Sequence, residues 1–257
     1  MGLSQRREKL VARLGTSKTR AREGAVLVEG VRAVGEAIDS GAEVDFVVVS
    51  PRLEVSHSGQ RLARRLEGVD VERVDDRVLD RLSDTEHGQG VLLVCSEPSA
   101  GLDAVARGGR YLVLDGVQDP GNAGTLVRSA VAFGLDAVVC LDGTVDPWAA
   151  KTVRASAGTV FRLSVVRATA DDALARLHAE GIPLYVADKD GEDVDREPGT
   201  RSFAMAVGNE GRGVRGALRD AARRSLAVPM PGGAESLNVA MAGAIILHSL
   251  TRSATDD

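Results

Sequence analysis

Short runs of β-branched and aliphatic residues alternate with amphipathic helical patterns along most of this chain, and this alternation constrains its fold more than any other feature. Repeated alternation of strand and helix is typical of an α/β protein with a parallel sheet covered on both faces. In the first part of the chain we expect strands at Ala25–Glu29, Phe46–Ser50 and Val91–Cys95, and helices at Val31–Ser40 and Gly59–Glu67.

A stretch that begins with Pro98 and Ser99 and contains three glycines interrupts this pattern. It predicts a linker at 99–109 between a first domain at 1–98 and a second at 110–257. The second domain has strand patterns at Tyr111–Asp115, Ala137–Leu141, Val160–Val166, Pro183–Ala187, Phe203–Val207 and Leu226–Val228. Its helical patterns are Asn122–Phe133, Trp148–Ala155, Asp171–Ala179, Val214–Arg223 and Ser236–Leu250. The last of these is apolar almost all round, so we expect a buried helix.

Composition limits the compartment and the partners. Cys95 and Cys140 each lie inside an apolar run, which predicts buried thiols in a reducing compartment. We find no segment with the length of a membrane span and no signal peptide, so we expect a cytoplasmic protein. Net charge is −5, but residues 1–24 hold seven basic and two acidic side chains, which leaves −10 for the remainder. This basic segment is either a polyanion contact or a solvated terminal helix.

Several common kinds of site lack their signatures. The strand that opens each expected domain is not followed by a G-x-G-x-x-G turn, which argues against a dinucleotide-dependent oxidoreductase. The chain contains no Walker-type phosphate loop, which argues against a nucleotide hydrolase. None of the four histidines stands at zinc spacing to another, so no metal is expected. A nucleophile elbow of the form G-x-S-x-G is also missing.

The first of three informative segments runs from a strand into a helix, with the sequence LDGVQDPGNAG at 114–124. We expect Asn122 near the start of this helix, because an asparagine side chain can accept hydrogen bonds from free backbone N–H groups. Arg128 lies opposite the apolar arc of the helix and should point away from the core. An exposed arginine without a role is the alternative interpretation.

The other two segments also follow strands. The sequence FAMAVGNEGRG at 203–213 places Glu210 among glycines, which permit close approach of a ligand to the backbone; a flexible turn is the alternative. The sequence VPMPGGAESLNV at 228–239 leads into the last helix, where Ser236 could simply be the N-cap. Loops at the carboxyl ends of strands are where open α/β sheets bind ligands.

In this order, the three segments resemble the three motifs of the SpoU (TrmH) family of RNA ribose 2′-O-methyltransferases, within the SPOUT superfamily. The resemblance covers about Tyr111–Leu250, and the first part is similar to a small ribosomal-protein-like α/β domain. Ser129, Val228 and Ala240 depart from the commonest residues, threonine, isoleucine and a small polar residue respectively. These departures remove no polar group that the family uses directly.

The resemblance implies a SPOUT catalytic domain with a parallel sheet and a trefoil knot, preceded by a small RNA-binding domain. It also implies a homodimer with its active site at the subunit interface, and S-adenosylmethionine as the cofactor. The expected cofactor-binding residues are Gly208, Val228, Met230 and Leu237. The expected catalytic residues are Asn122, Arg128, Glu210, Ser236 and Asn238.

The resemblance identifies these residues but leaves the role of Arg128 open. The family proposal makes Arg128 the general base, but a guanidinium normally stays protonated, so Arg128 could equally clamp a phosphate and stabilise developing alkoxide charge. We expect Asn122 and Asn238 to orient the ribose, Ser236 to lie at the substrate edge, and Glu210 to fix loop geometry. The expected substrate is large-subunit ribosomal RNA. Transfer RNA, a ribosome-protecting resistance role and a non-catalytic RNA-binding assembly factor are the alternatives.

Overall fold

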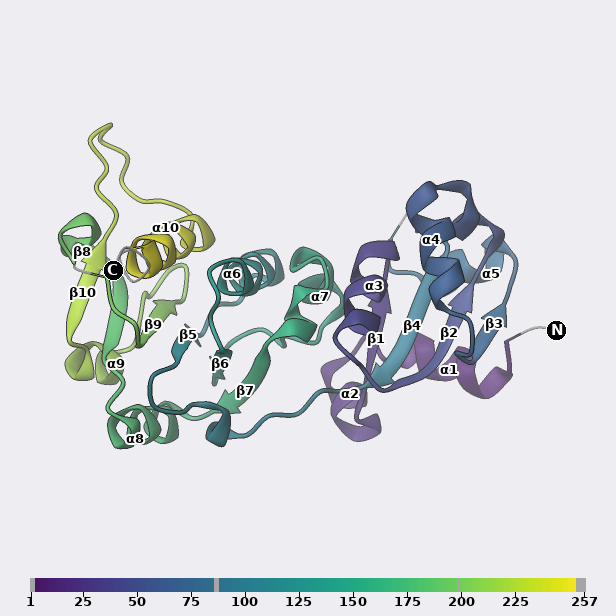
Figure 1. Cartoon of the computed structure of the whole chain (residues 1–257), viewed down its shortest axis with the longest axis horizontal. Coiled ribbons are helices and arrows are strands. Elements are labelled where there is room, and N and C mark those ends of the chain that lie inside the picture. The colour runs from purple at the N-terminus through teal and green to yellow at the C-terminus, as the bar shows by residue number, and fades with distance from the viewer. Residues whose placement is uncertain (1–2, 86–87, 198, 253–257) are drawn as a thin grey trace. The chain divides into compact units, whose positions relative to one another are not determined.

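The computed structural model describes residues 3–85, 88–197 and 199–252, which form two compact units (Figure 1). The first contains the described residues up to Pro98 together with Trp148–Arg162, and the second contains Ser99–Pro147 and the described residues from Leu163 onward. This division differs from the expected one in two respects. Residues 99–109 belong to the second unit, and the segment 148–162 belongs to the first.

The first unit is built on a four-stranded mixed sheet with the order β1-β4-β2-β3. β4 is antiparallel to both β1 and β2, and only β2 and β3 are parallel, so the sheet is not the parallel one expected from alternation. Its elements are α1 (Gln5–Arg13), α2 (Ser17–Glu23), β1 (Ala25–Glu29), α3 (Val31–Asp39), β2 (Val44–Val49), η1 (Pro51–Val55), α4 (His57–Arg65), β3 (Val71–Arg73), α5 (Asp76–Leu82), β4 (Val91–Ser96), α7 (Ala150–Ala155) and η3 (Thr159–Arg162).

The basic segment at the start of the chain forms two packed helices. Val11 and Leu14 are buried in a core with Phe46 and other sheet residues. Arg7 pairs with Asp70 and Glu72, and its guanidinium lies 4.5 Å from the centre of the Phe46 ring. The charge of Arg7 is therefore neutralised within the unit and is not available to a polyanion. The exposed basic side chains of this segment are Arg6, Lys9, Arg13, Lys18 and Arg22.

Segment 148–162 packs on the first unit through apolar contacts and two ion pairs. α7 lies against β1, and η3 lies against α3. Arg154 pairs with the buried Glu29 at 3.2 Å, and Arg162 pairs with Glu36 at 2.5 Å. Gly158 has φ +84°, and a Cβ there would lie 2.6 Å from the Cα of Ala33, so both backbone conformation and close packing require glycine.

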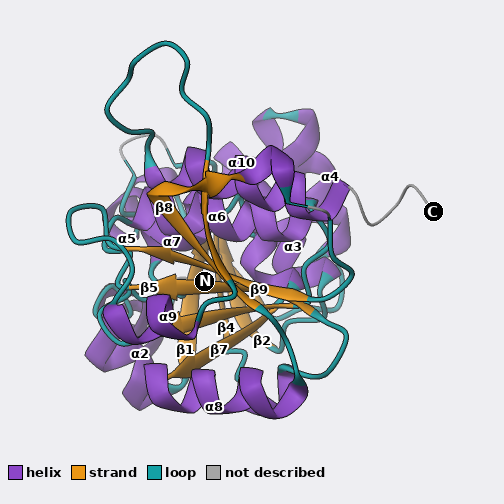
Figure 2. Cartoon of the chain, turned by 90° about the vertical axis from the view of Figure 1, so that its left-hand side faces the viewer, coloured by secondary structure: helices purple, strands orange, loops and turns teal. Residues whose placement is uncertain are grey.

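The second unit is a six-stranded, wholly parallel sheet with the order β10-β8-β9-β5-β6-β7, in agreement with the expected architecture. α8 and α9 cover one face, and α6 and α10 lie on the other (Figures 1 and 2). Its elements are η2 (Leu102–Ala104), β5 (Arg110–Asp115), α6 (Pro120–Ala132), β6 (Ala137–Leu141), β7 (Ser164–Ala168), α8 (Ala170–Glu180), β8 (Leu184–Asp193), η4 (Val194–Arg196), β9 (Phe203–Gly208), α9 (Gly216–Ala221), β10 (Arg224–Ala227) and α10 (Val239–Arg252).

Two element boundaries correct the sequence-based expectations. The strand expected at Val160–Val166 is wrong over its first half, where η3 occupies Thr159–Arg162 and the strand β7 runs over Ser164–Ala168. The last helix begins at Val239 rather than at Ser236, and it is not buried on every side. Its Met241 and Ile245 are 57% and 39% exposed.

The register of the central strands brings two of the informative segments together. β5 and β9 pair in parallel from Arg110 and Phe203 to Asp115 and Gly208, so the loops that follow them leave the same edge side by side. α10 packs against α6, where a Cβ on Gly243 would lie 2.5 Å from Leu126. The absence of a side chain at Gly243 therefore permits the close contact between the two helices.

Both cysteines are buried free thiols, as predicted. Burial raises the pKa of the Cys95 thiol and of the Cys140 thiol to about 12. A thiol with so high a pKa is a poor nucleophile and metal ligand at neutral pH. Cys95 and Cys140 therefore serve as core residues.

Candidate active site

A pocket of about 370 Å³ lies at the carboxyl ends of β9 and β10, beside the middle of β8 and the start of α10. All four expected cofactor-binding residues line it: Gly208, Val228, Met230 and Leu237. Further aliphatic side chains contribute to its walls, including Leu226, Val239 and Ile246. A concave, largely apolar pocket of this size with a few polar groups is typical of small-molecule sites.

The loop that follows β9 folds back on itself at one side of this pocket. The N–H of Asn209 donates to the carbonyl of Gly213 at 3.1 Å, and the N–H of Gly213 donates to the carbonyl of Asn209 at 2.8 Å. A Cβ on Gly208 would lie 2.1 Å from the carbonyl carbon of Gly213. Glycine at 208 is therefore a steric requirement of the loop.

Asn209 holds this loop against the first segment, and sequence reasoning missed it. Its Nδ2 donates to the carbonyl of Gly116 at 2.9 Å, and its Oδ1 accepts from the N–H groups of Gly211 and Arg212. An asparagine beside a glycine-rich turn is a known signal for this kind of side-chain-to-backbone bonding. Asn209 therefore positions Glu210.

Three of the expected catalytic residues form one hydrogen-bonded set. Asn122 on α6 donates from Nδ2 to Glu210 Oε1 at 3.0 Å, and its Oδ1 accepts from Asn238 Nδ2 at 2.9 Å. Glu210 and Asn238 also line the pocket. Residues from three distant segments of the sequence thus meet at the edge of one cavity.

Hydrogen bonds keep the carboxyl group of Glu210 ionised. Burial raises its pKa, but donation by Asn122 and by the backbone N–H groups of Glu210, Gln118 and Asp119 outweighs burial, so the net pKa lies below its ordinary value. A carboxylate with a lowered pKa is a weak base at neutral pH. The expectation that Glu210 fixes loop geometry rather than moving protons is in keeping with this environment.

The helix caps differ from the expected ones. Asp119 is the N-cap of α6 and accepts from the N–H of Asn122 at 2.8 Å, so Asn122 lies in the first turn rather than at the cap. Asn238 precedes α10, and its Oδ1 accepts from the N–H groups of Ala240 and Met241. The N-cap interpretation of Ser236 is therefore wrong. Ser236 is exposed and lines the pocket.

Arg128 neither lines the pocket nor joins the hydrogen-bonded set of Asn122, Glu210 and Asn238. It is exposed, as its position opposite the apolar arc predicts. Among the residues that the structure describes, no side chain or carbonyl pairs with its guanidinium. Arg128 therefore presents free donors to whatever binds over α6.

An ion pair between Asp115 and Arg215 links the end of β5 to the loop before α9. Asp115, at the end of β5, is 4% exposed and accepts from the backbone N–H of Arg215 at 2.7 Å and from its Nε at 2.6 Å. Arg215 also donates to the carbonyl of Asp142 at 3.0 Å. This pair was not anticipated from the sequence. It joins the end of β5, within the first informative segment, to the residue that precedes α9.

Comparison with known proteins identifies the family. The model of the SpoU rRNA methylase family matches residues 109–248, which is more than half of the chain. The chain belongs to the SpoU rRNA methylase family. A model described as an MRM3-like substrate binding domain matches residues 6–93. The SpoU match includes every expected cofactor-binding and catalytic residue.

Individual members of the SpoU family are similar over nearly the whole chain. The 23S rRNA (guanosine(2553)-2′-O)-methyltransferase RlmP of Bacillus subtilis is 39% identical over 93% of both chains. The solved structure of a TrmH-family RNA methyltransferase from Porphyromonas gingivalis has a TM-score of 0.85 and 30% identity, covering 98% of this chain and 99% of that one. AviRb from Streptomyces viridochromogenes, solved in complex with AdoMet, has a TM-score of 0.86 and 26% identity, with the same coverage.

These matches confirm the expected family, the α/β SPOUT fold class and the expected class of enzyme, an S-adenosylmethionine-dependent rRNA methyltransferase. In the part of the chain that the structure describes, no three His, Cys, Asp or Glu side chains are grouped so as to hold a metal ion. No helix within 3–85, 88–197 or 199–252 combines the length and apolar character needed to cross a membrane.

Proposed function

We propose that this enzyme transfers a methyl group from S-adenosylmethionine to the 2′-hydroxyl of one ribose in large-subunit ribosomal RNA. The observation that carries the proposal is the hydrogen-bonded set of Asn122, Glu210 and Asn238 at the edge of an apolar pocket. The names of the related enzymes support the substrate and the acceptor atom, and the relative with 39% identity is named for a guanosine. A guanosine ribose is therefore the first target to test.

The pocket fits the cofactor. Its aliphatic walls can enclose an adenosine ring, and Gly208 at the end of β9 forms part of the lining. We assign cofactor binding to the backbone of Gly208, Val228 and Leu237, with Met230 beside them. S-adenosylmethionine bound there supplies an electrophilic methyl group. The chain's own contribution is to hold the ribose oxygen in line for displacement, which accounts for much of the acceleration in such reactions.

The polar residues divide into those that orient and those that stabilise charge. Asn122 and Asn238 are fixed by each other and by Glu210, so they are suited to orient the ribose. Ser236 is exposed and lines the pocket, and we assign it to the edge that receives the substrate. Arg128 keeps free N–H donors, which suit an RNA phosphate and the negative charge that develops on the ribose oxygen. An assembly factor without catalysis would have no need of this set.

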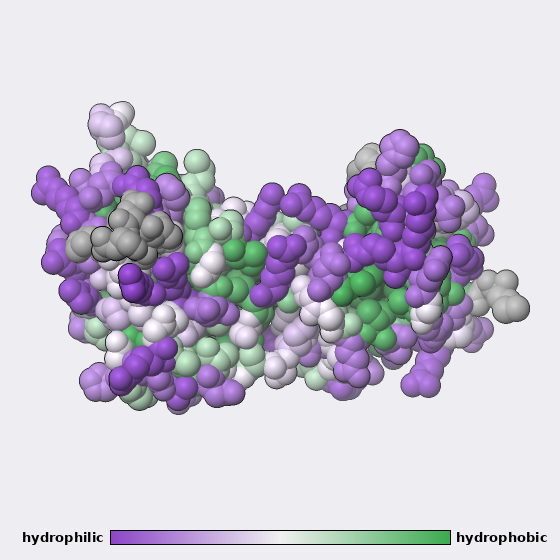
Figure 3. All heavy atoms as spheres, viewed as in Figure 1, coloured by the Kyte–Doolittle hydropathy of each residue, from purple (hydrophilic) through white to green (hydrophobic). Residues whose placement is uncertain are grey.

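We further propose a homodimer in which a second copy covers α6 and α10. Figure 3 shows apolar atoms over α6 and the neighbouring part of α10. Met241 and Ile245, both on α10, are large apolar side chains that are exposed. An exposed apolar surface of this kind is typical of an interaction site. We also propose that the second unit contains the trefoil knot implied by the family. We propose a cytoplasmic location, where the ribosomal RNA substrate is found.

The chemistry of the product tests this function. Incubate the full chain and radiolabelled S-adenosylmethionine with 23S rRNA made by transcription, then digest the RNA in alkali. A 2′-O-methyl group prevents the ribose oxygen from attacking the adjacent phosphate, so the label should survive in a methylated dinucleotide. Label found only in mononucleotides with a methylated base would show that the acceptor is not the ribose.

A further inference from the structure

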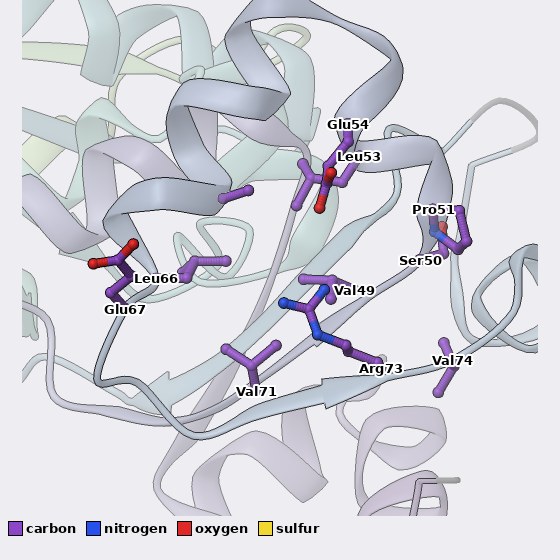
Figure 4. Close-up of a pocket in the computed structure, with 11 residues that line it drawn as sticks. Val49, Ser50, Pro51, Leu53, Glu54, Leu66, Glu67, Val71, Arg73 and Val74 are labelled. Carbon is purple, nitrogen blue, oxygen red and sulfur yellow. The ribbon is translucent and has the colours of Figure 1, made fainter. Parts of the chain in front are cut away.

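The first unit contains a second pocket of about 370 Å³, which plays no part in the active site. It lies at the carboxyl ends of the parallel strands β2 and β3, between η1–α4 and β3 (Figure 4). Its walls are mainly aliphatic and come from Val49, Leu53, Leu66, Val71 and Val74. Open α/β sheets bind ligands at this end of their strands, and the size suits a small ring system.

A buried hydroxyl in the wall of this pocket has no hydrogen-bond partner. Ser50, directly after β2, is 4% exposed. Its Oγ makes no hydrogen bond with any residue that the structure describes. Buried polar side chains are normally paired, so an orphaned hydroxyl in the wall of a cavity indicates a ligand that supplies the missing partner.

Two oppositely charged side chains face the pocket from different elements. The guanidinium of Arg73, on the edge strand β3, and the carboxylate of Glu54, in η1, both project into it in Figure 4. Neither forms an ion pair or a side-chain hydrogen bond within the part of the chain that the structure describes. A planar donor and an acceptor are thus both available to one ligand.

The charges around the pocket indicate which part of an RNA could enter it. The lining holds two carboxylates, Glu54 and Glu67, against the single guanidinium of Arg73, so a phosphate would be repelled. An uncharged nucleobase would not be repelled by these carboxylates. Every residue of the lining lies within 6–93, the segment that matches a substrate binding domain.

We propose that this pocket receives one nucleobase turned out of the substrate RNA, and that the base carries an exocyclic amino group. The guanidinium plane of Arg73 stacks on the base, as arginines do on unstacked bases in RNA complexes. Glu54 accepts a hydrogen bond from the amino group, and the Ser50 hydroxyl pairs with the base edge. The inference rests on the proposed function, since it requires an RNA substrate.

Matched variants of the full chain test the pocket. Arg73→Ala removes the guanidinium, and Arg73→Lys keeps the charge but loses the plane. Arg77→Ala is the control, because Arg77 is also exposed and also lacks a partner among the described residues. At physiological salt, both Arg73 variants should bind transcribed 23S rRNA about tenfold more weakly than the wild type, whereas Arg77→Ala should lose far less. Equal losses in Arg73→Ala and Arg77→Ala would overturn the proposal.

Ser50→Ala separates ligand binding from folding. It removes an unsatisfied hydroxyl, so the melting temperature should stay the same or rise while RNA affinity falls. A fall in melting temperature with unchanged RNA affinity would show a structural role and would overturn the assignment of Ser50.

Chemical footprinting identifies the base itself. One base of the transcript should be protected from dimethyl sulfate or kethoxal by the wild type and by Arg77→Ala, and should become reactive with Arg73→Ala. Wild-type methylation without any such Arg73-dependent protection would overturn the pocket and leave the proposed function standing. Arg73-dependent protection without an alkali-stable product would overturn the proposed function and leave the pocket standing. Failure of the wild type to bind the transcript would overturn both.

Discussion

Arg128 and the trio of Asn122, Glu210 and Asn238 are constrained in opposite ways. Each member of the trio is held by hydrogen bonds to the other members or to backbone N–H groups. Arg128 is exposed, and no residue that the structure describes pairs with its guanidinium. A fixed trio can orient a ribose, while a free guanidinium can adjust to a phosphate. The site therefore combines preorganised and adaptable groups.

The freedom of Arg128 leads to a prediction about catalysis. Arg128→Ala should reduce methyl transfer at least about a hundredfold, because electrostatic stabilisation of a transition state is commonly worth that much. Stability should change by no more than about 0.5 kcal/mol, since the side chain is exposed and away from caps. Single-turnover methylation and urea unfolding measure the two effects. Arg128→Lys is the companion, and a variant that kept wild-type turnover would remove Arg128 from the mechanism.

At the scale of elements, the N-cap of α6 positions one of the site residues. The carboxylate of Asp119 accepts from the N–H of Asn122 and so fixes the turn that presents the Asn122 side chain to Glu210. Aspartate before proline at a helix start is a recognised sequence signal, which could have identified Asp119 as the cap. Helix α8 has an equivalent cap at Thr169, far along the chain from the catalytic segments.

These two caps allow a controlled experiment. Asp119→Ala and Thr169→Ala should each lower the free energy of unfolding by about 0.5–2 kcal/mol, the usual cost of losing an N-cap. Only Asp119→Ala should also lower the rate of methyl transfer, because only its loss releases Asn122. Urea unfolding and methylation assays on both variants check this. Equal activity losses in the two variants would attribute the effect to stability alone.

At the scale of the whole molecule, a single chain leaves Arg128 apart from the pocket that Glu210, Ser236 and Asn238 line. If dimerisation completes each site, Arg128 of one copy serves the pocket of the other. Mixing inactive Arg128→Ala with inactive Asn238→Ala under conditions of subunit exchange should then restore about a quarter of wild-type activity, because half of the dimers are mixed and each mixed dimer has one intact site. Methylation by the mixture measures this. No recovery despite proven exchange would place all the residues of one site in one chain.

The sequence predicted the parts of this protein that depend on local pattern. Strands β1, β4, β5, β6 and β9 fall at or within one residue of their expected positions, because buried strands are short aliphatic runs between turn residues. β8 was expected to end at Ala187 but continues to Asp193 through polar residues that the apolar pattern does not include. All four cofactor-binding candidates line one pocket, and Arg128 is exposed as its helical position predicts. The strands and the exposure of Arg128 require only periodicity and turn chemistry, whereas the cofactor-binding residues were expected from the resemblance to the SpoU family.

Only the tertiary structure decided what depends on contacts between distant residues. The segment 148–162 follows β6 in the chain, yet Arg154 and Gly158 pack on the first unit, against Glu29 and Ala33. Asn209 acquires its role from the carbonyl of Gly116, 93 positions earlier. The Ser50 hydroxyl looks ordinary in the sequence, and its isolation appears only when the surrounding atoms are in place. Periodicity records which side of an element is apolar, but not which partner covers it, because many partners satisfy the same pattern.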